Sequence, residues 1–148
     1  MSVLKQRIND DVKSAMRSKE KDQLGVLRLI TAAIKQIEVD QRIALDDQQV
    51  IAVLDKLAKQ HRDSIEQFDK AGRNDLAEKE RFELAIVQSY LPTALAEEEI
   101  VQLIADAITA TGASGIKDMG KVMAIIKSQA QGRADMGKLS AQVKAQLG

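Results

Sequence analysis

The chain has 148 residues and a formal net charge of zero, because 22 Lys and Arg balance 22 Asp and Glu. This balance excludes a domain-wide basic field for nucleic acid. The absence of cysteine excludes disulfides, thiolate nucleophiles and cysteine-based zinc sites. With no signal-peptide pattern and no apolar run of about 18 residues, we expect a cytoplasmic protein without a membrane segment.

Apolar residues recur at three- and four-residue spacing in the first part of the chain, which predicts long amphipathic helices. Gly25 lies inside the second of these, where glycine costs about 1 kcal/mol relative to alanine, so we expect a close helix contact there. Leu29 and Phe82 are expected to face the core, and Asp22 is a candidate helix cap. The expected helices cover about 2–18, 22–40, 46–72 and 74–91.

The composition changes at Pro92, which we take as the boundary between two subdomains, 1–91 and 92–148. Short helices rich in Ala, Gly and Met follow it, starting with one over about 97–110. The fold class predicted is therefore all-α, with an N-terminal bundle of long helices joined to a small C-terminal three-helix unit.

An internal repeat supplies the last two helices. Over 118–129 and 135–146, seven of twelve positions are identical. Asp118 and Asp135 are expected to cap the two helices, and the glycines two residues later to permit close packing. A helix start with glycine and lysine also favours anions, so Lys121 and Lys138 are candidate phosphate contacts. The aspartates oppose an anion at the same place, which favours the structural interpretation of the repeat.

Several segments resemble the YqeY family, and the most specific lie in the repeat. The segments are 27–38, 59–73, 90–92, 119–123 and 132–140. The family is similar to the tail region of the B subunit of the tRNA-dependent glutamine amidotransferase. The resemblance implies a two-part helical fold and a role related to tRNA. By homology, the resemblance would assign the activity class of a carbon-nitrogen ligase with glutamine as amido-N-donor.

Independent catalysis is not expected. Amide transfer needs a nucleophile for glutamine hydrolysis and a site for ATP, and the sequence has neither a cysteine nor a nucleotide-binding loop. His61 is the only histidine, and its register with Leu57 and Ile65 favours a core or half-exposed residue over a metal ligand. We therefore expect no catalytic residues, no metal site and no cofactor.

The segment 113–148 carries six bases against Asp118 and Asp135, a formal charge of +4. An ordinary solvated face is the alternative interpretation. Such a segment without aromatic residues would bind the backbone and shape of RNA and would not contact unstacked bases. The resemblance makes tRNA the first candidate. The expected RNA-binding residues are Lys117, Lys121, Lys127, Arg133, Lys138 and Lys144.

Two further functions stay open at this point. One is an adaptor whose helical hairpins dock a protein partner of the translation apparatus. The other is a non-catalytic component of an amidotransferase reaction that other subunits carry out.

Overall fold

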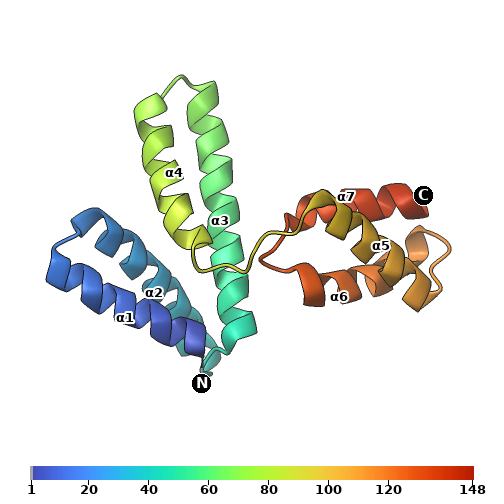
Figure 1. Ribbon diagram of the computed structural model, residues 1–148, viewed down its shortest axis with the longest axis horizontal. Coiled ribbons are helices and arrows are strands. Elements are labelled where there is room, and N and C mark those ends of the chain that lie inside the picture. The colour runs from blue at the N-terminus through green and yellow to red at the C-terminus, as the bar shows by residue number, and fades with distance from the viewer. Residues whose placement is uncertain (1) are drawn as a thin grey trace. The chain divides into compact units, whose positions relative to one another are not determined.

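The computed structural model describes residues 2–148 and shows an all-α protein, which confirms the predicted fold class (Figure 1). No strand occurs in this part of the chain. The helices are α1 (Val3–Ser18), α2 (Lys21–Gln41), α3 (Asp47–Lys70), α4 (Asn74–Gln88), α5 (Glu97–Thr111), the 3₁₀ helix η1 (Ile116–Asp118), α6 (Met119–Ala130) and α7 (Met136–Leu147).

Contacts divide the chain into two compact units, one ending at Leu91 and one spanning Pro92–Gly148. We call them the N-terminal unit and the C-terminal unit. In the N-terminal unit, α1 and α2 form one hairpin and α3 and α4 a second (Figure 1). The hairpins share an aliphatic core, in which Leu27 and Leu54 are fully buried. This core agrees with the scarcity of aromatic residues in the chain.

Side chains far apart in sequence connect the helices of the N-terminal unit, both within the first hairpin and between the two hairpins. Lys5 of α1 pairs with Glu38 of α2 at 2.7 Å. Tyr90 donates a hydrogen bond of 2.5 Å to Asp11, and the guanidinium of Arg7 lies 4.8 Å from the centre of the Tyr90 ring. Burial, followed by this bond to Asp11, raises the pKa of the Tyr90 hydroxyl. The chain that leaves α4 is therefore fixed to α1.

The ends of the helices differ from expectation in two places. Asp22 lies in the first turn of α2, while Glu20 occupies the cap position without a side-chain bond. The helix α4 ends at Gln88, before the expected Leu91. Single-turn bonds from the amides of Tyr90 and Leu91 replace the helical pattern there, because Pro92 keeps the residue before it out of the helical region.

Three residues expected at helix contacts lie at the surface instead. A Cβ added to Gly25 would meet no atom within 4 Å, so this glycine does not mark a close helix contact. Leu29 is 60% exposed and Phe82 is 48% exposed. All three line a groove of about 650 Å³ between α2 and α4. The apolar stripe of α2 is wider than the face that its neighbours cover.

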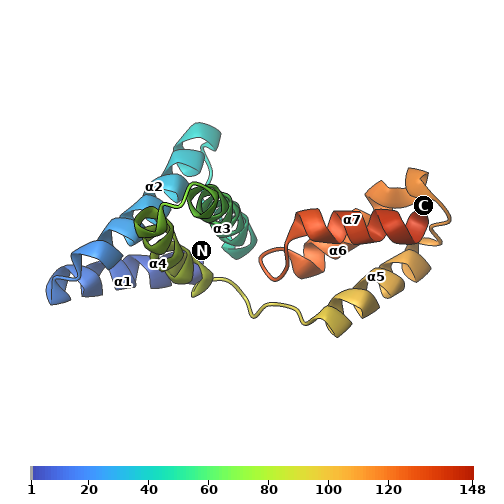
Figure 2. The ribbon, with the colours of Figure 1, turned by 90° about the horizontal axis from the view of Figure 1, so that it is seen from above.

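In the C-terminal unit, α6 packs against both α5 and α7 (Figures 1 and 2). Its separate core has the fully buried Val122, Ile126, Leu139 and Val143 at its centre. None of the helices in residues 2–148 combines the length and apolar composition that crossing a membrane requires.

Candidate nucleic-acid interface

The expected RNA-binding residues all lie in the C-terminal unit, and the five lysines among them are exposed. Lys117 belongs to η1, while α6 carries Lys121 and Lys127, and α7 carries Lys138 and Lys144. Within the described structure, none of the salt bridges involves a residue of the C-terminal unit. The lysine charges are therefore not used in ion pairs within the unit.

The structure brings Lys117 and Lys121 together around Asp118 at the start of α6. The Asp118 carboxylate accepts a hydrogen bond of 3.1 Å from the amide of Ser114. This bond, and next the positive charges of Lys121 and Lys117, lower the pKa of Asp118. One acid thus lies between two exposed bases, so the site keeps an excess of positive charge.

Asp118 does not cap α6 with its side chain, contrary to expectation. It occupies the cap position, but its carboxylate makes no bond to a first-turn amide of α6. The 3₁₀ helix η1 runs directly into α6, and the Met119 amide donates to the carbonyl of Ile116. The carbonyl of Ile116 thus accepts from one amide at the start of α6. The Asp118 carboxylate binds the Ser114 amide in the preceding loop instead.

Asp135 does cap α7. Its Oδ1 accepts from the amide of Gly137 at 2.8 Å and from that of Lys138 at 3.4 Å. An anion at this helix start would have to compete with a carboxylate for the same amides. The ammonium of Lys138 is thus the group at this position that is suited to phosphate.

The glycines of the repeat do not create close helix packing. A Cβ at Gly120 would meet nothing within 4 Å, and one at Gly137 would meet only the Asp135 side chain, at 3.2 Å. Both lie at the exposed starts of their helices, where no neighbouring helix approaches. Gly137 leaves room for the Asp135 cap, and this local packing replaces the predicted role.

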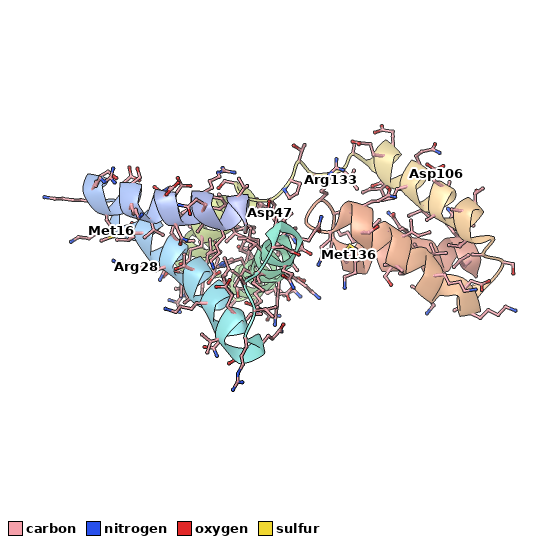
Figure 3. The ribbon with its side chains drawn as sticks, turned by 90° about the horizontal axis from the view of Figure 1, so that it is seen from below. Met16, Arg28, Asp47, Asp106, Arg133 and Met136 are labelled. Atoms are coloured by element: carbon pink, nitrogen blue, oxygen red, sulfur yellow. The ribbon has the colours of Figure 1, made fainter. Side chains whose placement is uncertain are left out.

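Arg133 has a structural role that the sequence did not reveal. Its Nε donates to the carbonyl of Thr93 at 2.9 Å, and its own carbonyl accepts from the amide of Leu95 at 2.8 Å. Arg133 is half-buried where the segment before α5 meets the turn between α6 and α7 (Figure 3). It fastens this segment to its own unit, so its substitution would disturb the fold as well as the charge.

The lysines do not gather on a single face. The spacing from Lys121 to Lys127, and from Lys138 to Lys144, places the two lysines of each helix about 120° apart around the axis. The repeat thus puts Lys121 and Lys138 in equivalent positions, and Lys127 and Lys144 in another pair of equivalent positions. Lys117 and Lys121 lie together at the start of α6, whereas Lys138 lies at the start of α7, and it is the other end of α7, at Gly148, that approaches Ile116 of η1. We take the Lys117–Lys121 pair and Lys138 as two separate phosphate contacts of the candidate interface.

The helix α5 carries the opposite charge. Its four acids are exposed and it has no lysine or arginine; the acids are Glu97, Glu98, Glu99 and Asp106. Figure 3 marks Asp106 on this helix. The acids on α5 and the lysines on η1, α6 and α7 therefore belong to different helices, although Glu97 accepts a hydrogen bond from Gln142 of α7. A polyanion is favoured near the exposed lysines and disfavoured near α5.

A second polar cluster lies in the N-terminal unit and was missed. His61 of α3 is half-buried as expected, but it faces Glu80 and Glu83 of α4. The three side chains offer ligand atoms within 4.8 Å of one another, the one group of this kind found in residues 2–148. The Glu80–Glu83 spacing, which places both acids on one helical face, was the available signal.

Comparison with known proteins supports the resemblance. A family model described as Yqey-like protein matches residues 5–147. "Altered inheritance of mitochondria protein 41, mitochondrial" of Pyrenophora tritici-repentis is 33% identical over 139 residues, which are 86% of this chain and 74% of that protein. The protein of the same name from Eremothecium gossypii is 39% identical over 95 residues, covering 62% of this chain and 52% of the relative. That from Kluyveromyces lactis is 36% identical over 106 residues, covering 67% and 57%.

Proposed function

We propose that this chain, which belongs to the YqeY-like protein family, is a non-catalytic accessory protein whose C-terminal unit binds structured RNA through its phosphates. The observation that carries the proposal is the set of exposed lysines in a unit that forms no salt bridge among its described residues. The resemblance to the tail of the amidotransferase B subunit makes tRNA the first candidate.

The chemistry of the unit favours the RNA backbone over the bases. Residues 92–148 contain no Phe, Tyr or Trp on which an unpaired base could stack. Ammonium groups on exposed helix surfaces suit phosphate oxygens, which carry no sequence information. We therefore propose recognition of charge and shape, with little dependence on base identity.

The compartment is also a proposal. The names of the relatives assign those proteins to mitochondria, and the cytoplasm is kept for this chain as a proposal alone. A role with tRNA is compatible with both compartments, because translation takes place in each.

The test is titration of unmodified tRNA with the wild type and with the double variant Lys121→Glu/Lys138→Glu, at about 50 and 200 mM salt. The wild type is expected to bind at low salt and to weaken steeply with salt. The double variant should bind more weakly, with a salt slope smaller by about 2, since each lost phosphate contact removes about 1. Failure of the wild type to bind at low salt contradicts the proposal.

Two control variants make the test specific. Lys13→Glu/Lys59→Glu changes the same number of exposed lysines in the N-terminal unit, and it should leave binding nearly unchanged. Glu98→Gln/Asp106→Asn removes negative charge from α5 and should leave the affinity unchanged or raise it. If the two lysine variants weaken binding equally, the site is not in the C-terminal unit.

An adaptor role is the second candidate, and one observation favours it. Leu29 and Phe82 are exposed beside Gly25 in the groove between α2 and α4. Exposed apolar side chains around a groove are typical of protein contacts. If this groove binds a protein of the translation apparatus, the double variant Leu29→Ser/Phe82→Ser should no longer bind that protein. RNA binding should be unchanged.

A role as a non-catalytic component of an amidotransferase reaction is a further proposal, which rests on the resemblance alone. The assay is glutamine-dependent ammonia transfer to charged tRNA by the partner subunits, with and without this chain. Purified alone, the chain should release no ammonia from glutamine and hydrolyse no ATP.

A further inference from the structure

The single histidine of the chain lies at the centre of a polar cluster between α3 and α4. Its Nδ1 is 2.6 Å from Oε2 of Glu80 and 3.7 Å from Oε2 of Glu83. The side chains of His61, Glu80 and Glu83 are 16%, 22% and 14% exposed. Two carboxylates and an imidazole thus converge on one point that solvent reaches only in part.

The surroundings make this cluster costly without a cation. Buried apolar residues line the seam between α3 and α4, with Ala58 and Ala77 fully buried and Val87 1% exposed, and the Arg81–Asp69 ion pair also crosses it. In the described structure, neither glutamate has an ion-pair partner other than His61. Even a protonated imidazole balances only one of the two carboxylates, and unpaired charge in a partly buried seam is destabilising.

We propose that His61, Glu80 and Glu83 bind a divalent transition-metal ion, with Zn²⁺ as the reference case. Imidazole nitrogen and carboxylate oxygen together suit Zn²⁺ and its neighbours, whereas Mg²⁺ and Ca²⁺ prefer sites made of oxygen alone. A divalent ion also supplies the positive charge that the two carboxylates lack. Three protein ligands leave a fourth position for water, which the partial exposure of the cluster permits.

The geometry requires little movement for this. Ligand atoms about 2.1 Å from a tetrahedral Zn²⁺ lie about 3.4 Å apart. The Nδ1–Glu83 distance of 3.7 Å is already close to that value, and the Nδ1–Glu80 distance of 2.6 Å has to open by less than about 1 Å. Rotation of the partly exposed Glu80 side chain can supply this change.

The ion would join α3 to α4 across the hairpin and stabilise the N-terminal unit, because it binds the folded state alone. This site lies outside the candidate RNA interface, so each can fail without the other. The alternative is a metal-free cluster in which a protonated His61 donates to Glu80.

The test uses the tag-free chain, since a histidine tag would bind the metal itself. Zn²⁺ is titrated calorimetrically into the wild type, His61→Ala, Glu83→Gln and Glu78→Gln. The last is the matched control, because Glu78 is an exposed glutamate of α4 that pairs with Arg81 instead. We expect one equivalent to bind to the wild type and the control, and more than about tenfold weaker binding to the other two.

A second readout does not depend on any variant being folded. His61 is the only histidine, so its ring gives a single imidazole signal in carbon-edited NMR spectra of the wild type. The first equivalent of Zn²⁺ should shift this signal and raise the thermal midpoint of the N-terminal unit. The proposal is overturned if the signal stays in place, or if all four proteins bind Zn²⁺ alike.

Discussion

The two units of this chain use their charged residues in opposite ways. All the salt bridges among the described residues lie in the N-terminal unit, where Lys5–Glu38 and Arg81–Asp69 connect different helices. The C-terminal unit has six bases and six acids, yet it pairs none of them. Its helices are held by the apolar core and by Arg133, through bonds to backbone groups.

In a chain of zero net charge, the distribution of ion pairs separates charges that stabilise the fold from charges that a ligand can use. Charges that pair across helices serve the fold, and they are not available to a ligand without a loss of stability. Charges that remain exposed and unpaired cost the fold little and keep their field. The proposed RNA interface lies in the C-terminal unit, whose described charged residues form no ion pairs with one another.

The largest effect is expected from breaking one core at a time. Leu54→Ala in the N-terminal unit and Leu139→Ala in the C-terminal unit each remove a side chain that is at most 1% exposed. Each should lower the unfolding free energy of its own unit by about 2–5 kcal/mol. Amide hydrogen exchange measures the two units separately, and protection should fall only in the unit that is substituted. A parallel loss of protection in both units would show that they fold as one.

A smaller effect should distinguish the two copies of the repeat. Asp135→Ala removes two bonds to first-turn amides, and we expect it to lower the unfolding free energy by about 0.5–2 kcal/mol. Asp118→Ala removes one bond to the Ser114 amide and should cost less. Hydrogen exchange in α6 and α7 measures both, and neither change should weaken tRNA binding. An equal or larger loss for Asp118→Ala would contradict the assignment of the caps.

The sequence predicted the all-α fold because each long helix shows its own periodicity and punctuation. It was wrong at Leu29 and Phe82, since periodicity tells which residues share a face but not whether a neighbour covers it. Asp118 does occupy the cap position of α6, but the expected side-chain bond is absent for a local reason: the turn at 116–118 is too short to show a pattern of its own in the sequence.

The candidate RNA interface and the His61 cluster also differ in how far the sequence predicts them. The exposed lysines follow from composition and from the repeat, although their role in RNA binding stays a prediction. The meeting of His61 with two glutamates depends on how α3 and α4 align in their hairpin, which no local pattern of α3 contains. Arg133 was assigned to RNA by its charge, and its structural role was not foreseen because its backbone partners, Thr93 and Leu95, are distant in sequence.

The smallest effect is a pH dependence of the N-terminal unit. The hydrogen bond from Lys5, followed by that from the Leu45 amide, lowers the pKa of Glu38 from its usual 4.5. A carboxyl with a lowered pKa in the folded state stabilises that state above its unfolded pKa. This contribution is lost as the pH falls through the folded pKa.

Glu38→Gln should therefore lower the unfolding free energy at neutral pH, by at most about 1 kcal/mol because Lys5 is partly exposed. The difference from the wild type should shrink below pH 4.5 and vanish once Glu38 is protonated in the folded protein. Urea unfolding of both proteins between neutral pH and the acid transition, followed by hydrogen exchange in α2, measures it. Glu66→Gln is the control, since the Glu66–Lys70 pair is exposed and should contribute no more than about 0.5 kcal/mol. The difference between Glu38→Gln and the wild type could instead stay constant down to the acid transition. Packing, and not the ion pair with Lys5, would then determine the contribution of Glu38 to stability.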